Sequence, residues 1–279
     1  MSARAGFSLP EALIALTIST VLVMLAGTVF LVQNDYYGHV LLRSQVQENA
    51  RAMTEMVATE VRSIGAGGFI VADSSRLVIR VPMVTALVCG RQGSDVMVHV
   101  PGGLASITTA EVSGFGHLAS GTWSYYDNTW GQLLKTGGNP RQECSSNGAD
   151  TVGVSAEFFR FDEVSNDTGI TAANLLGATL MIYRETELKL DASTLVSGDR
   201  ALYRGEYGGT LTELATGLSS GAHFEYWTGS AWSKAVTGAT LASITRVRLV
   251  AQSQGLGETS QQATYDFGWT VDIPLANAL

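Results

Sequence analysis

The sequence predicts an α+β protein in which a long N-terminal helix packs on one face of a mostly antiparallel β-sheet with loop insertions. Up to Ile64, apolar residues recur at helical spacing, whereas from Ala66 onward apolar and polar residues alternate as in half-buried strands. Gly65, Gly67 and Gly68 lie where the period changes, and glycine commonly follows the last turn of a helix. These glycines therefore mark the boundary between the helix and the sheet.

The first part of the predicted helix is long and apolar enough to cross a membrane. Ala12–Val32 contains 21 residues without a charge. As a helix it would be about 31 Å long, close to the thickness of the hydrocarbon core of a bilayer. Arg4 precedes the run, and Asp35 is the first charged residue after it. A cation on the short side predicts a cytoplasmic N-terminus and an exported remainder.

A secretory signal peptide is the alternative for such an N-terminus. Its apolar region has about 7–15 residues and is followed by small residues at a cleavage site. The run here is longer, its end TVFLVQNDYYG lacks such a site, and Glu11 lies inside its entrance. The pattern therefore favours a membrane-spanning helix.

The helical pattern continues beyond the membrane-length run. One face is apolar and carries Leu42, Val46, Ala50, Met53, Val57, Val61 and Ile64. The opposite face is polar and carries Arg43, Gln47, Arg51, Glu55, Thr59 and Arg62. We expect one helix from near Phe7 to Ile64, about 87 Å long. Gly27 and Gly38 are the places where it would bend most easily.

The charge balance is acidic, with 17 Lys+Arg against 25 Asp+Glu and a net charge of −8. Phosphate binding requires clustered Lys and Arg, and the sequence contains no run of like charge. We therefore expect no direct binding of nucleic acid.

Cys89 and Cys144 are far apart in the sequence, outside any C-x-x-C pair and without a histidine at metal-ligand spacing. They form either two buried free thiols or one disulfide, which requires an oxidising compartment. Because the membrane segment places both outside the cytoplasm, we predict the disulfide. On the chain-entropy model, closing a loop this long stabilises the fold by about 4 kcal/mol.

The remainder of the chain has the pattern of a β-rich domain. Stretches typical of strands are RLVIRVPMV, SDVMVHV, ATLMIYRETELKL, HFEYW, ITRVRLVAQ and ATYDFGWTVDI. Gly90–Gly148 is the most loop-like part, and the two cysteines enclose it. Its aromatic cluster TWSYYDNTWGQ is either a recognition surface or packing under a long loop, and we favour packing.

Motifs for catalysis or metal binding are weak. GLSSG places Ser219 at the centre of G-x-S-x-G, but a strand pattern follows it where a nucleophile elbow needs a helix. The histidines match no metal motif: His39, His99, His117 and His223. The oxygen-rich stretch FDEVSNDTG is a weak calcium candidate through Asp162, Glu163, Asn166 and Asp167, and a solvated turn is the favoured alternative. We expect no enzyme activity, no cofactor and no metal.

The N-terminal stretch AGFSLPEALIAL resembles the start of type IV prepilins and type II secretion pseudopilins. In that family a prepilin peptidase cuts after the glycine of a short leader, the new N-terminal residue is N-methylated, and the fifth mature residue is Glu. The resemblance implies cleavage between Gly6 and Phe7, N-methylation of Phe7, and a role in assembly for Glu11. It implies a pilin-like division into a leader (1–6), a transmembrane and assembly helix (7–32), its amphipathic continuation (33–65) and a β-rich head (66–279).

The resemblance also suggests why a carboxylate stands at the entrance of the apolar run. A charge in hydrocarbon costs about 2.5–3.5 kcal/mol on insertion scales. In a filament, Glu11 would meet the free amine of Phe7 on a neighbouring copy, so that each charge cancels the other. Alternatively, Ser8-Leu9-Pro10-Glu11 has capping-box spacing, and Glu11 caps its own helix. The two roles are compatible. Pro10 replaces the aliphatic residue usual in the family.

The C-terminal half resembles, in strand order, the PilW-like minor pilins and the J-type minor pseudopilin of type II secretion. The residues concerned are Phe224, Tyr226, Trp227, Trp232, Val247 and Leu249. The resemblance implies a minor pilin at the priming or tip position. It would enter the inner membrane as a precursor with a periplasmic head. The assembly platform would then join it to other pilins in a pilus on the cell surface. The alternatives are a J-type pseudopilin and a bitopic membrane protein with an exported binding or enzymatic domain.

Overall fold

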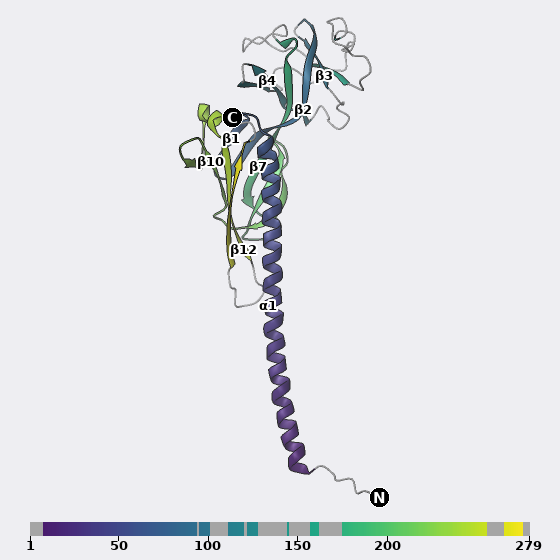
Figure 1. Ribbon diagram of the computed structural model, residues 1–279, viewed down its shortest axis with the longest axis vertical. Coiled ribbons are helices and arrows are strands. Elements are labelled where there is room, and N and C mark those ends of the chain that lie inside the picture. The colour runs from purple at the N-terminus through teal and green to yellow at the C-terminus, as the bar shows by residue number, and fades with distance from the viewer. Residues whose placement is uncertain are drawn as a thin grey trace.

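The structure is a computed structural model that describes residues 8–93, 95–100, 111–119, 122–127, 144, 157–161, 175–255 and 265–275. In these residues, one long α-helix precedes a sheet of 13 strands with antiparallel pairing, so the predicted α+β class is confirmed. Figure 1 shows helix α1 (Leu9–Ser63) as a long rod whose C-terminal half lies against the sheet. Its N-terminal half projects away from the head.

The elements after α1 are short apart from two long strands. They are β1 (Phe69–Ala72), β2 (Arg76–Gln92), β3 (Asp95–Val100), β4 (Gly114–Ala119), β5 (Thr122–Asp127), β6 (Glu157–Phe161), β7 (Thr179–Ala192), β8 (Arg200–Glu206), β9 (Thr212–Leu218), β10 (His223–Trp227), β11 (Trp232–Ser233), the 3-10 helix η4 (Gly238–Ser243), β12 (Arg246–Gly255) and β13 (Tyr265–Pro274).

Each stretch predicted as a strand overlaps a strand of the structure, namely β2, β3, β7, β10, β12 and β13. The loop prediction for Gly90–Gly148 is wrong for β4 and β5, which form a hairpin there. Gly114 and Gly116 hide the pattern of β4, because glycine is a poor strand former. At the first of these positions glycine is required by space: a Cβ on Gly114 would lie 2.1 Å from the carbonyl oxygen of Tyr126.

Helix α1 begins after Ser8, whose extended backbone (φ −77°, ψ 148°) makes it the N-cap. The helix continues through Gly27 and Gly38, and its 55 residues make it about 82 Å long. Ile64 returns to extended backbone, and Gly67 has a φ of +76°, which L residues rarely adopt. This turn leads the chain from the helix into β1.

Strands β2 and β7 form the centre of the sheet. They pair antiparallel along most of their length, with a register shift between Pro82 and Val84. The strand order is β11-β10-β12-β9-β8-β7-β2-β3-β6, with β13 on β12 and β1 on β2. The other edge of β7 is shared, because β4 pairs with its first half and β8 with its second half.

The described part of the head contains two large hydrophobic clusters, arranged along β2 and β7, and a small third one of Cys89, Met97 and Cys144. The proximal core packs α1 against the sheet through the helix residues Met53, Val57, Ala58 and Val61 and the C-cap residue Ile64. The distal core consists of Ala86, Val88, Val96, Val98, Val100, Val112, Phe115, Tyr126, Phe161, Leu175, Leu180 and Ile182. We call the parts around these two large clusters the proximal and the distal lobe. Figure 1 shows the distal lobe beyond the C-terminal end of the helix.

The apolar helix face predicted from the sequence is buried from Ala50 onward. Leu42 and Val46 are the first two residues of that face, and their side chains are not among those that the structure describes. Burial of this face, rather than helix propensity, holds the second half of α1 on the head.

Replacing Ile64 by Ala tests this packing. The side chain is 0% exposed in the proximal core, so we expect a loss of about 2–5 kcal/mol in the free energy of unfolding. Urea unfolding of the full chain in detergent micelles, followed by tryptophan fluorescence, measures it. The control is Leu31→Ala on the same helix, at a residue 68% exposed, which should leave the midpoint unchanged. Equal midpoints for both variants would contradict the packing.

Candidate assembly and anchoring site

The helix start engages Glu11 within the chain. The backbone N–H of Ser8 donates to Oε2 of Glu11 at 3.0 Å, and the Ser8 hydroxyl donates to the same oxygen at 2.9 Å. Pro10 stands in the first turn, where a missing N–H costs nothing. The predicted capping role of Glu11 is therefore present in the single chain. Gly6 and Phe7, the predicted cleavage and methylation positions, lie outside the described residues.

The apolar segment that follows is not covered by the described residues of the head. Within the described residues, Leu9–Gly38 is the one helical segment long and apolar enough to span a membrane, and none of its most apolar stretch is buried. Its hydroxyl groups bond to carbonyls of the preceding turn; they belong to Thr17, Ser19, Thr20 and Thr28. These side chains therefore bring no unpaired donor into hydrocarbon. The segment requires apolar surroundings from outside the chain, either lipid or other apolar helices.

Aromatic residues mark the end of this segment. Tyr36 and Tyr37 are 64% and 65% exposed, and their rings lie edge to face 6.3 Å apart. Tyrosine is enriched at the membrane–water interface, because its ring is apolar and its hydroxyl is hydrated. Together with Asp35, the pair marks one boundary of a candidate membrane span near residue 36.

An ion pair that the sequence did not predict ties the helix to the sheet. Nε of Arg204 in β8 donates to Oε1 of Glu60 in α1 at 2.5 Å, and the Glu60 side chain is 11% exposed. The other carboxylate oxygen of Glu60 is buried without a hydrogen bond in the described structure. The sequence gives no sign of this ion pair, because a glutamate on a helix surface is ordinarily solvated. Only the contact with β8 shows that Glu60 joins the helix to the sheet.

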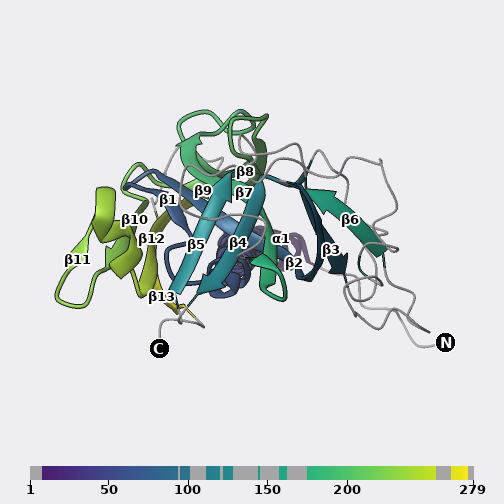
Figure 2. The same ribbon diagram turned by 90° about the horizontal axis from the view of Figure 1, so that it is seen from above.

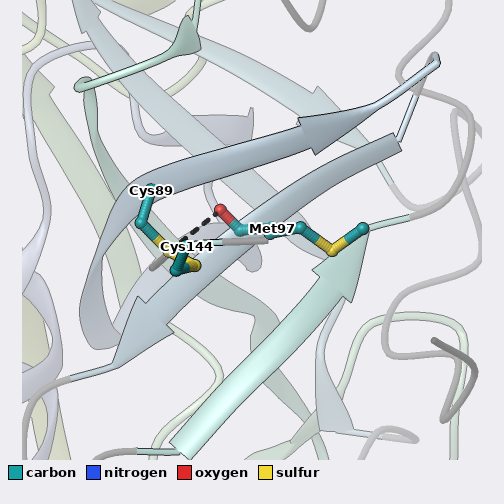
Figure 3. Close-up of a disulfide and its surroundings, with 3 residues drawn as sticks. All are labelled: Cys89, Met97 and Cys144. Carbon is teal, nitrogen blue, oxygen red and sulfur yellow. Dashed lines mark hydrogen bonds between the residues drawn. A yellow bond between two sulfur atoms is a disulfide. The ribbon is translucent and has the colours of Figure 1, made fainter. Parts of the chain in front are cut away.

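The predicted disulfide is present in the structure. Cys89 of β2 is bonded to Cys144, with Cα atoms 4.8 Å apart, and both residues are buried (Figure 3). Sγ of Cys89 lies 3.6 Å from the carbonyl oxygen of Met97 in β3. The bond ties residue 144 to the central strand of the distal lobe. A stable disulfide is typical of an exported domain.

The other candidate chemistry is not assembled in the described residues. Ser219 lies in the turn between β9 and β10, so a strand follows it and the nucleophile elbow is absent from this turn. Groups of three or more His, Cys, Asp or Glu residues able to hold a metal are not found in the described part of the chain. The weak calcium candidates lie outside it: Asp162, Glu163, Asn166 and Asp167.

The described part of the aromatic cluster packs within the molecule, as favoured from the sequence. Tyr126 belongs to the distal core, and its ring stacks on Phe115 with centroids 5.1 Å apart. Trp123 and Tyr125 lie on the other face of β5, against Gly65 at the end of α1. These aromatics therefore connect β5 to the distal core and to the helix end.

Comparison with known families agrees with the geometry of the helix start. Residues 1–27 match the family model of the prokaryotic N-terminal methylation motif. The match supports a precursor of the type IV pilin or pseudopilin class, whose members are structural subunits processed by prepilin peptidase, anchored in the membrane and assembled with other pilins. No curated protein and no solved structure matches the chain.

Breaking the ion pair between helix and sheet should destabilise the head. Glu60→Gln leaves the guanidinium of Arg204 partly buried without its counter-charge, so we expect a loss of about 2 kcal/mol in the free energy of unfolding. Arg51 and Glu55 form a matched control pair on the same helix, with side chains 82% and 67% exposed. Glu55→Gln should cost less than about 0.5 kcal/mol. Urea unfolding in micelles compares the two, and equal losses would contradict a structural role for Glu60.

Removing the disulfide tests the tie in the distal lobe. The double variant Cys89→Ser, Cys144→Ser should lose about 2–4 kcal/mol, because the unfolded chain is no longer constrained. In cells, the native cysteines should react with a maleimide only after reduction. Labelling without reductant would show free thiols and refute an oxidised, exported head.

Proposed function

We propose that the protein is a minor pilin of a type IV pilus, of the PilW-like kind, acting in priming or at the tip of the filament. One observation carries the proposal: a methylation motif at residues 1–27 leads into a membrane-length helix that the rest of the described chain does not cover. Outside lipid, such a helix is stable only among other apolar helices. Assembly with other pilins supplies them.

On this proposal the leader (1–6) is removed by prepilin peptidase between Gly6 and Phe7, and the amine of Phe7 is methylated. The precursor lies in the inner membrane with its N-terminus in the cytoplasm and its head (66–279) outside. The pilus assembly platform then moves the helix (7–32 and its continuation 33–65) from lipid into the filament. The disulfide supports an exported head, because such bonds persist in oxidising compartments.

Glu11 has the capacity for capping and for pairing at once. A carboxylate accepts about four hydrogen bonds, and Ser8 supplies two of them. The remaining capacity is available to the ammonium group of Phe7 on a neighbouring subunit. In surroundings without water an unpaired carboxylate is costly and a hydrogen-bonded pair is tolerated. Pairing therefore favours one axial register between subunits.

The size of the head supports a low-copy position. The described part of the head forms two lobes, and the distal lobe extends beyond the end of the helix (Figure 1). A head of this bulk suits the end of a filament better than a closely packed shaft. The acidic balance weighs against direct DNA capture by this subunit.

The mature N-terminus provides the first test. Intact-mass analysis of the chain from cells with active prepilin peptidase should show loss of residues 1–6 and one added methyl group on Phe7. A chain that still begins at Met1 would favour a bitopic membrane protein with an exported binding or enzymatic domain. Co-purification with secretion-system rather than pilus subunits would favour the J-type pseudopilin.

Glu11 provides the second test. Glu11→Ala should leave membrane insertion unchanged and reduce incorporation into sheared filaments, because the pairing carboxylate is lost. Glu48→Ala is the control, since Glu48 is exposed on the same helix beyond the apolar run. Fractionation and immunoblotting measure both steps. Wild-type incorporation of Glu11→Ala would refute the pairing role.

A further inference from the structure

The two lobes are joined where the pairing of β2 with β7 is irregular. β2 contributes Leu77 and Ile79 to the proximal core, and Ala86 and Val88 to the distal core. The register shift with β7 lies between these sets and includes Pro82, which has no N–H for the ladder. A bulge disrupts pairing locally and bends the strand. By the backbone pairing alone, the distal lobe would be free to tilt at this point.

A cation and aromatic rings lie beside this junction. The guanidinium of Arg80 in β2 is 4.8 Å from the ring centroid of Tyr125 in β5 and 5.5 Å from that of Tyr183 in β7. Its Nη2 lies 3.4 Å from Oδ1 of Asp127, and its Nε lies 3.8 Å from Oε1 of Glu185. The side chain of Arg80 is only 16% exposed. One residue of β2 thus contacts two further strands, β5 and β7, in a setting where cation–π and ionic contacts are strengthened by desolvation.

The same cluster reaches the end of α1. The hydroxyl of Tyr125 donates to the carbonyl oxygen of Ala66 at 3.2 Å. Nη1 of Arg80 lies 3.5 Å from the carbonyl oxygen of Gly67. A Cβ on Gly65 would lie only 3.0 Å from the Tyr125 hydroxyl, so ring and helix end are in close contact. Figure 2, which looks along the helix, shows β4 and β5 across its end. The β4–β5 hairpin is therefore docked, through Tyr125, on the turn that follows the helix.

The hairpin is also held on β7. The hydroxyl of Tyr183 lies 2.9 Å from Oδ1 of Asp127 and 3.1 Å from the carbonyl oxygen of Tyr126. It fills the space that the absent side chain of Gly114 leaves open, since a Cβ there would be 2.5 Å from the hydroxyl. Movement of β5 away from the helix end would break these contacts together.

We propose that Arg80 is a latch that fixes the orientation of the distal lobe relative to α1 by closing a hinge at the β2 bulge. The inference concerns the head alone and does not rest on the proposed pilin function. Without the cation, the carboxylates of Asp127 and Glu185 face each other in a partly buried site. Burial raises the pKa of Glu185, the charge of Asp127 raises it further, and Arg80 lowers it. Loss of Arg80 removes its contacts with β5, β7 and the carbonyl oxygen of Gly67, so the junction opens while each lobe keeps its own core.

The latch predicts a change in the distance between the lobes. Spin labels are introduced through unnatural amino acids at Thr59 on α1 and Arg91 on β2, both exposed, so that the native cysteines stay paired. Pulsed electron paramagnetic resonance on the full chain in micelles gives the distance distribution. We expect a narrow distribution for the parent chain and a broader one, shifted in mean, for Arg80→Leu.

Arg76→Leu is the matched control. Arg76 lies on the same strand and pairs with Glu187 at 2.7 Å, within the proximal lobe. It should leave the distribution narrow. The latch is overturned if Arg80→Leu gives the parent distribution, or if both variants broaden it equally.

A second variant decides the matter if Arg80→Leu does not fold. Arg80→Lys keeps the charge but removes the planar guanidinium that contacts the rings of Tyr125 and Tyr183. It should broaden the distribution, and a distribution identical to that of the parent chain overturns the proposal. Circular dichroism confirms that each variant is folded.

Discussion

A single continuous helix has to satisfy two different surroundings, and the rest of the molecule is arranged around this constraint. The first half of α1 is apolar on all sides and is not covered by the described chain. The second half is amphipathic and provides one wall of the proximal core. Because the helix is unbroken between them, the head is held in fixed relation to whatever surrounds the first half. The Glu60–Arg204 pair adds a directional contact to this otherwise non-directional burial.

The two lobes of the head are attached to α1 in different ways. The proximal lobe is bound to α1 by packing, whereas the distal lobe is connected through β2, β7 and the contacts around Arg80. The disulfide lies wholly in the distal lobe and ties it internally without joining it to the helix. The orientation of the distal lobe therefore depends on a small number of polar and aromatic contacts. Such contacts are more readily changed than a buried core.

These features fit a protein that acts by assembly. An exposed apolar helix, a carboxylate at its entrance and an oxidised head are requirements of a subunit that passes from membrane to filament. The carboxylate of Glu11 at the start of α1 can serve two roles. It caps the helix in the single chain, and it keeps hydrogen-bonding capacity for a cation from another copy.

The sequence alone determined the helix, its two halves, the change of period after Ile64, the class of fold, and the candidate positions Gly6, Phe7 and Glu11. These follow from local periodicity, composition and a contiguous motif, which need no knowledge of distant partners. The cysteine pair followed from the compartment that the apolar run implies. The tertiary structure alone decided the division into two cores, the β4–β5 hairpin on the helix end, and the roles of Glu60 and Arg80. Arg204 is 144 residues from Glu60, and Tyr183 is about a hundred from Arg80. The role of such residues depends on the side chains that folding brings next to them, and a local sequence pattern does not contain this information.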